Sequence, residues 1–374
     1  MFKRRTTCSL YDSVMAPKSG NELLRRLQLQ FPIIQAPMAG VSTPAMAAAV
    51  SNAGALGSMG VGATNAEGAA QMIHAARELS KRALHINVFC HRPATANHGV
   101  ETAWVERLRP HFERFGAAPP PGLTEIYKSF VADDAMLEQF IQSRPEVVSF
   151  HFGVPSADRI QALRKAGIVL IASATNLDEA DAVVAAGVDA VIAQGYEAGG
   201  HRGVFDPEAR DDCLGTFALT RLLVAKLNVP VIAAGGIMDG AGIAAVLKLG
   251  AVAAQLGTAF VACPESSADD GYRAALKSDA AFHTVMTAAI SGRRARCLTN
   301  RFTKLGESVS PREIPAYPIA YDAGKALHAV AKAKSEFGYG AQWAGQGAPL
   351  ARTMPSADLV SALAAELEAA RSAN

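Results

Sequence analysis

The sequence is poor in cysteine, in aromatic side chains and in net charge. Its five cysteines are Cys8, Cys90, Cys213, Cys263 and Cys297. An odd number without a CxxC spacing supports neither a disulfide framework nor a zinc site, and it fits a reducing cytoplasm. The formal net charge is +2, and no basic block follows Lys3–Arg5. We therefore expect no metal, no nucleic acid and no membrane as partners, and a small molecule as the ligand of a cytoplasmic protein.

The chain also lacks a long apolar run without interruptions. The uncharged stretch 27–65 contains three prolines and repeated Gly, Ser and Asn, so it is a poor membrane span and is better explained as buried wall. Residues 1–18 are basic but have no apolar core of signal-peptide length. A simple N-terminal extension is our expectation, and an organellar transit segment or a start at Met15 stays open.

Short apolar runs that alternate with helical patterns are what the chain has instead. Half of the residues are hydrophobic and only 6% are aromatic, so small side chains dominate the packing. Candidate strands lie at 32–38, 55–60, 84–89, 147–153, 168–174, 190–195, 230–236 and 251–260, and candidate helices at 43–52, 66–79, 156–166, 177–186, 216–227 and 240–249. Eight apolar strands separated by helices predict an α/β fold, a TIM (β/α)8 barrel with parallel strands.

Two segments are additional to the eight strand–helix units of a barrel. Residues 90–146 are too many for one crossover helix and contain the turn-rich AAPPPG at 117–122, which is typical of a lid. Residues 263–348 are rich in tyrosine, which indicates a smaller, mainly helical domain over the C-terminal face of the barrel. The expected organisation is an extension at 1–20, a barrel at 21–262 with an insertion at 90–146, the small domain at 263–348, and a helix packing back on the barrel within 349–374.

The stretch 190–204, AVIAQGYEAGGHRGV, carries the strongest functional signal. A buried strand there ends in a glycine-rich loop with His201, which brings backbone amides and an imidazole to one place. That combination suits a bound cofactor and proton chemistry near neutral pH. A solvent-exposed glycine turn is the plainer alternative, but chemistry in such barrels takes place at these strand ends.

The loops after the seventh and eighth strands indicate a phosphate. Gly235-Gly236 and the run 255–258 (QLGT) place glycine amides beside helix starts. Asn87 and Gln194 could bond the edge of a flat ring, and Pro37-Met38 could pack beside its face. A phosphorylated flavin would fit, whereas the alternative is that the glycine pairs only close turns.

Eight motifs occur in a characteristic order: PIIQAPMAG, INVFCHRPA, SFHFG, ASATN, QGYEAGGHRG, AAGGI, QLGTAF and WAGQG. With them the chain resembles the class I nitronate monooxygenases, formerly called 2-nitropropane dioxygenases, over about residues 30–350. QAPM, AAGG and QLGT also occur in flavin-dependent enoyl-ACP reductases and NADH:quinone reductases, so they support FMN only. AYPIAYDAGKAL and WAGQG point to the nitronate branch.

The resemblance implies FMN-dependent oxidation of alkyl nitronates, such as propionate 3-nitronate, by O2 to an aldehyde or ketone plus nitrite. It implies a one-electron flavin semiquinone, no use of NAD(P)H and a role in detoxification. The implied FMN contacts are Asn87, Gln194, Gly199, Gly236, Gln255, Leu256, Gly257 and Thr258, to which the strand ends add Pro37, Met38, Gly200 and Gly235. The implied catalytic residue is His201, and the implied substrate-binding residues are His151, Tyr127, Tyr272, Tyr317, Tyr321 and Lys325.

These residue types suit a small anion. Lys325, a protonatable His201 and several phenols can hold a nitronate through charge-assisted hydrogen bonds. With a neutral nitroalkane, His201 would be the base that removes the α-proton. The alternatives are that His151 is a core residue, that the tyrosines pack between domains and that Lys325 is solvated. The other histidines, His85 and His91 among them, receive no role.

Three rival functions stay open. One is an FMN-dependent NAD(P)H reductase of a quinone or enoyl thioester on the same barrel. Another is a flavin-free isomerase or lyase, and the third is a barrel that only binds. A homodimer is also open.

Overall fold

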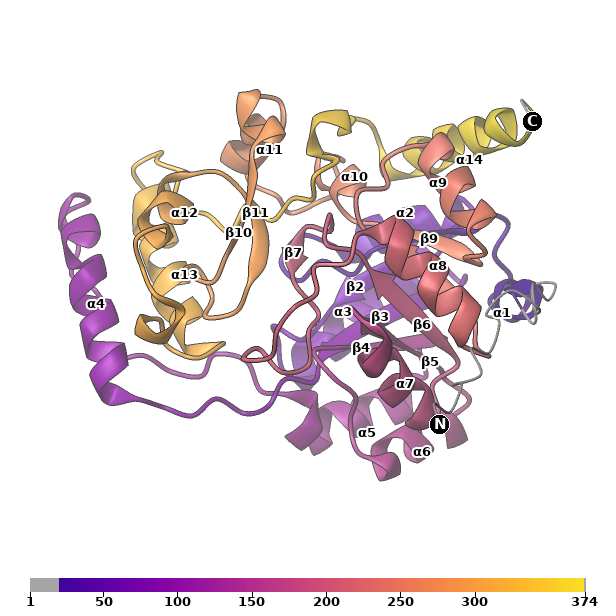
Figure 1. Ribbon diagram of the computed structural model, residues 1–374, viewed down its shortest axis with the longest axis horizontal. Helices are drawn as coiled ribbons and strands as arrows, with labels where there is room; N and C mark the ends of the chain where they lie inside the picture. The colour runs from indigo at the N-terminus through magenta and orange to yellow at the C-terminus, as the bar shows by residue number, and fades with distance from the viewer. Residues whose placement is uncertain (1–19, 373–374) are drawn as a thin grey trace, which may run out of the picture.

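The computed structural model describes residues 20–372 and contains the expected barrel (Figure 1). Its parallel strands are β1 (Ile33–Gln35), β2 (Gly57–Gly60), β3 (Leu84–Phe89), β4 (Val147–His151), β5 (Val169–Ala174), β6 (Ala190–Gln194), β8 (Val231–Ala234) and β9 (Ala253–Leu256). The sheet runs in the order β1-β9-β8-β6-β5-β4-β3-β2. Hydrogen bonds from the Gln35 amide to the Leu56 carbonyl and from the Leu56 amide to the Ile33 carbonyl, both 3.0 Å, close the ring. The predicted fold class is confirmed.

Helices cover the outer face of this ring, because the apolar strands need cover on both sides. They are α2 (Pro44–Asn52), α3 (Ala66–Leu79), α5 (Asp134–Ser143), α6 (Ala157–Lys165), α7 (Leu177–Ala185), α8 (Thr216–Lys226) and α9 (Gly240–Lys248), and α14 (Ser356–Ser372) packs on α9 and α2. Asn176 and Asp239 cap α7 and α9 by accepting bonds from backbone amides of the first turn. Within residues 20–372, no helix has both the length and the apolar character of a membrane span.

The amino-terminal end of the barrel is closed by side chains. Leu23 of α1 (Gly20–Arg26) and the nearby Leu27 belong to one buried cluster with Val147, Val169 and Ala190. These three residues are the first residues of β4, β5 and β6. The carboxyl end of the strands is therefore the end that remains for a ligand.

A polar chain lies inside the barrel beneath that end. The fully buried His85 contacts Ser58 Oγ through Nδ1 (2.8 Å) and Ser149 Oγ through Nε2 (2.6 Å). Asn87 Nδ2 donates to the same Ser149 Oγ (2.7 Å). Burial lowers the pKa of His85 to about 3, so its imidazole is neutral at physiological pH. These contacts fix the rotamer of Asn87, which the sequence predicts to contact the cofactor.

The insertion between β3 and β4 contains α4 (His98–Glu113), η1 (Phe130–Ala132) and α5. Figure 1 shows α4 far from the barrel, beside α13 (Ile319–Lys332). Trp104 of α4 is fully buried in a cluster that includes Phe302 and Leu327. The insertion therefore crosses from the barrel to the C-terminal part and brings Tyr127 with it on the return path.

The C-terminal part contains a small antiparallel sheet besides its helices. Its other elements are α10 (Thr258–Val261), α11 (Asp270–Leu276), η2 (Asp279–Phe282), α12 (Arg301–Gly306), η3 (Pro311–Glu313) and η4 (Ala348–Leu350). β10 (Thr284–Thr287) pairs with β11 (Ala295–Leu298), which pairs with β7 (Gly200–His201) from the barrel loop. The sequence predicted helices here and did not predict this sheet, which carries His201. The eighth strand also ends earlier than predicted, at Leu256, because α10 begins at Thr258.

Candidate functional site

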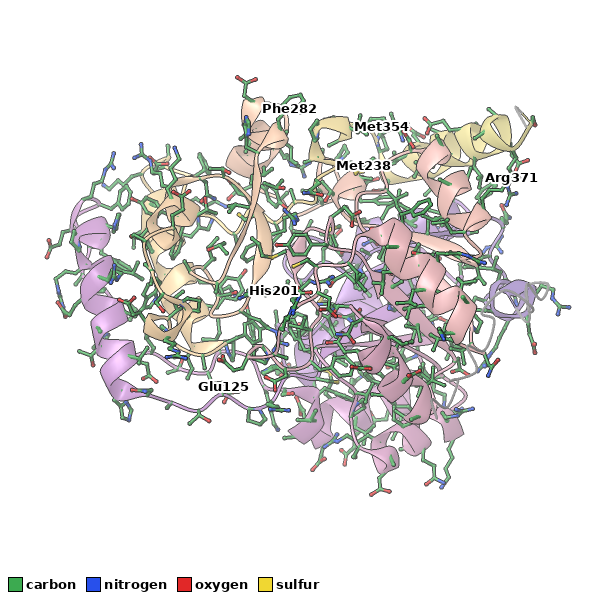
Figure 2. All side chains as sticks on the ribbon, in the orientation of Figure 1. Glu125, His201, Met238, Phe282, Met354 and Arg371 are labelled. Atoms are coloured by element: carbon green, nitrogen blue, oxygen red, sulfur yellow. The ribbon has the colours of Figure 1, made fainter. Side chains whose placement is uncertain are left out.

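A pocket opens at the carboxyl ends of the barrel strands and faces the C-terminal part. Figure 2 shows His201 between these two parts of the molecule. The predicted site residues that line the pocket are Pro37, Met38, Asn87, Tyr127, His151, Gln194, Gly199, Gly200, His201, Gly235, Gly236, Gln255, Gly257, Thr258, Tyr272, Tyr317 and Tyr321. The barrel thus gathers residues that are more than 280 positions apart in the chain, from Pro37 to Tyr321.

Two predicted site residues lie outside the lining. Leu256 is 1% exposed and packs in the apolar layer between strands and helices, because neighbouring residues of a strand face opposite sides. The Lys325 ammonium lies 5.0 Å from the ring centroid of Tyr127 and 5.7 Å from that of Tyr321. Lys325 therefore stands behind two tyrosines of the pocket wall and not in the wall itself.

The hydrogen bonds of His201 define its tautomer. His201 Nε2 lies 2.8 Å from Ser291 Oγ, and Ser291 Oγ lies 3.1 Å from the Arg293 carbonyl oxygen. Since a carbonyl only accepts, the serine hydroxyl donates to it, and the serine oxygen then accepts from His201 Nε2–H. A neutral His201 consequently carries its lone pair on Nδ1. That nitrogen forms no hydrogen bond with the residues that the structure describes.

The backbone of His201 is held from the barrel side. His151 Nε2 donates to the His201 carbonyl (3.1 Å), so in the neutral ring His151 Nδ1 accepts from Ser173 Oγ at 3.0 Å. Gln194 Nε2 donates to the same carbonyl (3.0 Å), and Gln194 Oε1 accepts from the Gly203 amide (2.7 Å). His151 and Gln194 thus position the His201 loop besides lining the pocket.

Both pocket imidazoles are neutral at physiological pH. Burial, followed by the nearby His151, lowers the pKa of His201 to about 3. Burial also lowers the pKa of His151 to about 4 against the opposing effect of its bond to the His201 carbonyl. The positive charge that a protonated His201 was expected to offer an anion is therefore missing in this structure, and His201 offers a lone pair.

The pocket tyrosines are protonated donors. Burial raises the pKa of Tyr127 to about 12 and raises the pKa values of Tyr317 and Tyr321 further. The Tyr317 hydroxyl is buried and has no hydrogen-bond partner within residues 20–372, which is costly unless a ligand accepts from it. Tyr272 differs, because its hydroxyl donates to the Trp343 carbonyl. Tyr272 is thereby committed to positioning the 343–347 segment.

Glycines near the last two strands allow segments to approach closely and the backbone to adopt positive φ values. A Cβ on Gly199 would lie 2.5 Å from the Gly345 amide nitrogen, so the two segments approach as closely as glycine alone permits. Gly235 and Gly236 have φ values of +124° and +69°, which favour glycine. The Gly345 amide donates to Thr258 Oγ1 (3.0 Å), which ties the WAGQG segment to the start of α10.

The donor set of this end of the pocket fits a flavin phosphate. The amides after β8 and β9 are neutral donors of the kind that binds phosphate. Gln255 Oε1 is buried and lacks a partner in the described part of the chain, so it can accept from a hydroxyl or N–H of a ligand. Asn87 keeps its carbonyl oxygen available, since only its Nδ2 bonds the barrel.

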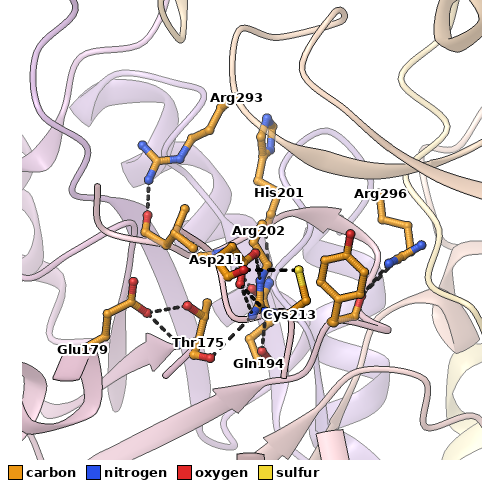
Figure 3. Close-up of polar contacts among 12 residues, drawn as sticks. Thr175, Glu179, Gln194, His201, Arg202, Asp211, Cys213, Arg293 and Arg296 are labelled. Atoms are coloured by element: carbon orange, nitrogen blue, oxygen red, sulfur yellow. Dashed lines mark hydrogen bonds and ion pairs between the residues drawn. The ribbon is translucent and has the colours of Figure 1, made fainter. Parts of the chain in front are cut away.

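Several residues of the site were not predicted. Glu197 accepts from the Thr216 amide (2.8 Å) and hydroxyl (2.9 Å) and so fixes the glycine loop on α8. Figure 3 shows Arg202 next to this loop, where it forms an ion pair with Asp211 at 2.8 Å. The same figure shows Arg293, which donates to the Val204 carbonyl. Nothing in the sequence marks Ser291 and Arg293 as site residues except Gly292, which lies between them. Trp343 was visible only as part of the WAGQG motif.

Comparisons with known proteins show the family of this chain. The family model described as nitronate monooxygenase matches residues 21–366. A nitronate monooxygenase of Paraburkholderia phytofirmans is 65% identical over 346 residues, which are 92% of this chain and 94% of that protein. One from Pseudomonas aeruginosa is 53% identical over 345 residues, 92% of this chain and 98% of that protein. The solved nitroalkane oxidase of Streptomyces ansochromogenes superposes with a TM-score of 0.86 at 40% identity and covers 94% of this chain and 99% of its own.

Proposed function

The chain belongs to the nitronate monooxygenase family and is an oxidoreductase that oxidises nitronates, and from this premise we propose that it uses FMN and O2. The products would be an aldehyde or ketone and nitrite, and the substrate a small alkyl nitronate such as propionate 3-nitronate. The observation that carries this proposal is that one pocket is lined by the glycine loops, by the neutral imidazole of His201 and by the Tyr317 phenol, whose hydroxyl has no partner among the described residues.

Flavin dependence follows from the family, and FMN in particular is our proposal. Gly235, Gly236 and the Gly257-Thr258 pair would hold its phosphate with backbone amides. Asn87 and Gln255 would bond its polar edge, and Met38 would pack on it. Bound FMN would supply the acceptor for the electrons of the nitronate and return them to O2.

His201 would act as a base through Nδ1, with Ser291 holding its tautomer. A base whose conjugate acid has a pKa of about 3 removes a proton from a weak carbon acid only uphill, at about 1.4 kcal/mol for each unit of pKa difference. Oxidation of a preformed nitronate needs no such proton transfer. We therefore propose that preformed nitronates are better substrates than neutral nitroalkanes.

The phenols would orient the anion. Tyr127 comes from the insertion, and Tyr317 and Tyr321 come from around the start of α13. The ring centroid of Tyr127 lies 6.4 Å from that of Tyr317 and 5.9 Å from that of Tyr321. Their raised pKa values keep the hydroxyls protonated, so they can donate to nitronate oxygens. The insertion and the small domain, which supply these rings, would thus shape the substrate end of the pocket.

The test of this assignment compares two substrates in one variant. His201→Asn should lower kcat/KM for a neutral nitroalkane by at least about 100-fold, a usual size for a general base, and should lower it less for the corresponding nitronate. His74→Asn, on an exposed side chain, is the control. An equal loss for both substrates would show that His201 binds or stabilises charge and is not the base. Release and identification of the bound flavin would test FMN directly.

We also propose that the protein works in the cytoplasm with residues 21–262 as the FMN part and 263–348 as the substrate part. The four cysteines in the described part of the chain, Cys90, Cys213, Cys263 and Cys297, are all unpaired, which supports a reducing compartment. The distribution of pocket residues supports the division, since the glycine loops precede residue 263 and Tyr317 and Tyr321 follow it.

A further inference from the structure

A buried arginine close to the pocket has no carboxylate partner. Arg293 lies in the turn between β10 and β11 and is 4% exposed. Its guanidinium donates only to backbone carbonyls, those of Val204 and, at 3.4 Å, Phe205, and its Nε has no partner. None of the ion pairs among residues 20–372 includes Arg293. Buried charges are normally paired because burial without a counter-charge is costly, so an exception of this kind calls for a functional explanation.

The carboxylates nearest to Arg293 are engaged elsewhere. Glu179 accepts from the Thr175 amide and hydroxyl with one oxygen, both at 2.7 Å, and from the Phe205 amide with the other at 2.8 Å. Asp206 faces Arg92 at 3.8 Å. Neither forms a contact with Arg293. The positive charge is therefore fixed in the protein interior with no carboxylate in contact with it, and Glu179 and Asp206 act on it only from a distance.

Phe152 connects this charge to the pocket wall. The Arg293 Cζ atom lies 4.1 Å from the Phe152 ring centroid, a close cation–π contact. The same ring lies 4.4 Å from His151, 5.4 Å from Tyr317 and 5.6 Å from His201, measured between centroids. Phe152 has a φ of +74°, which is rare for an aromatic residue and is maintained only where the surroundings demand it. One aromatic ring thus separates the guanidinium from three groups that line the pocket.

We propose that Arg293, held against Phe152, is the fixed positive charge by which this pocket selects the anionic nitronate over the neutral nitroalkane. The proposal rests on the nitronate-oxidising function and adds a specificity-determining residue that positions the anion through the field and does not touch it. In a protein interior, a charge that no carboxylate contacts acts on a nearby anion through Coulomb attraction that is weakened less than in water. Lys325 supplies charge less directly, because the residue is solvent-exposed and its ammonium lies behind two tyrosine rings.

The neighbouring groups respond to the same charge. Burial is the largest cause that lowers the pKa values of His91, His151 and His201, and the charge of Arg293 lowers them further. Burial lowers the pKa of Arg293 itself only to about 10. At neutral pH the arginine is therefore charged and the three imidazoles are neutral. The selectivity then comes from a charge that stays constant over the working pH range.

The first experiment separates binding of the anion from catalysis in the holoenzyme. Arg293→Gln keeps an amide donor for the carbonyls and removes the charge, and Arg293→Lys keeps the charge. We expect Arg293→Gln to raise KM for propionate 3-nitronate by about tenfold or more, with KM for a neutral nitroalkane changed by less than about threefold. Arg293→Lys should recover most of the nitronate affinity. Equal changes in KM for the two substrates would overturn the proposal.

Arg296→Gln is the matched control for lost packing. Arg296 is also buried, lies 4.8 Å from the centroid of the Tyr196 ring and donates to the Tyr196 carbonyl. Its removal should cost stability in the same sheet without changing the ratio of the two KM values. A change in that ratio as large as in Arg293→Gln would show that general loosening, and not the charge at Arg293, determines selectivity.

A second experiment uses the wild type and nitrate, a small planar anion, as the probe, so it does not depend on whether Arg293→Gln folds. Nitrate should inhibit competitively with a Ki that is constant between about pH 5.5 and 8, because the guanidinium stays charged and His91, His151 and His201 stay neutral. A Ki that decreases as one imidazole protonates would assign the charge to a histidine and refute the role of Arg293. A wild type that oxidises no nitronate would instead refute the proposed function.

Discussion

Four histidines with lowered pKa values, two of them buried and two partly exposed in the pocket wall, should make this protein sensitive to mild acid. His85, His91, His151 and His201 are neutral in the fold, with pKa values lowered by burial to about 3, 4, 4 and 3 from 6.5. On unfolding, each imidazole regains its ordinary pKa and takes up a proton below about pH 6.5. The unfolded state then binds more protons than the native state, so the free energy of unfolding falls as pH falls. The stabilisation is complete above pH 6.5 and is lost progressively down to about pH 3 to 4.

The magnitude follows from the same linkage. At pH 5, one imidazole that is protonated only when unfolded costs about 2 kcal/mol, so four together cost about 8 kcal/mol relative to pH 7.5. Native domains are stable by only about 5–15 kcal/mol. We therefore expect most of the stability to be lost near pH 5. Urea unfolding at half-unit steps from pH 8 to 5, followed by tryptophan fluorescence, measures the slope directly.

His85→Gln isolates one histidine. Glutamine can bond Ser58 and Ser149, the two partners of His85, but it does not titrate. Its slope of unfolding free energy against pH near pH 5 should be smaller than the wild-type slope by about 1.4 kcal/mol per unit. The same change at the exposed His74 is the matched control. Equal slopes in His85→Gln and wild type would refute the argument that His85 stays neutral in the fold.

Three further changes test other parts of the structure. Ser291→Ala removes the acceptor of His201 Nε2–H, so it should cost about 1–3 kcal/mol in urea unfolding and lower kcat/KM for a neutral nitroalkane, and an unchanged kcat/KM for that substrate would contradict the tautomer assignment. Gly199→Ala places a Cβ 2.5 Å from the Gly345 nitrogen and should weaken flavin binding by about tenfold in a titration; unaltered affinity would contradict the close approach of the two segments. Trp104→Ala should cost about 3–5 kcal/mol by calorimetry while flavin content stays unchanged, and a much smaller cost would show that α4 does not anchor the insertion on α13.

The barrel was predictable because its signals are local. The bounds of α3 and β3 agree with the prediction, since apolar periodicity and an Asn65 cap define one and a continuous apolar run defines the other. The pocket glycines were predictable for a similar reason, because glycine pairs directly follow apolar strands in the sequence. Asn176 and Asp239, each placed between a strand and a helix, accept bonds from the first turns of those helices.

The features that sequence reasoning missed depend on contacts between distant segments. β7 has two residues, too few for any periodicity, and becomes a strand only because Ala295 of β11 pairs with His201. His85 resembles any histidine in an apolar strand until the barrel register places Ser58 and Ser149 on either side. Arg293 looks like a surface arginine in SGRRAR, and its burial depends on Phe152, more than 140 residues earlier in the chain.

The most direct test of the proposed chemistry is an anaerobic visible spectrum of the purified protein with propionate 3-nitronate, followed by admission of air and a nitrite assay. We predict flavin bands that change on addition of the nitronate without NAD(P)H, and nitrite that forms once O2 enters. Flavin bands that do not change with the nitronate but bleach with NADH would contradict nitronate oxidation and would assign the pocket to a reductase.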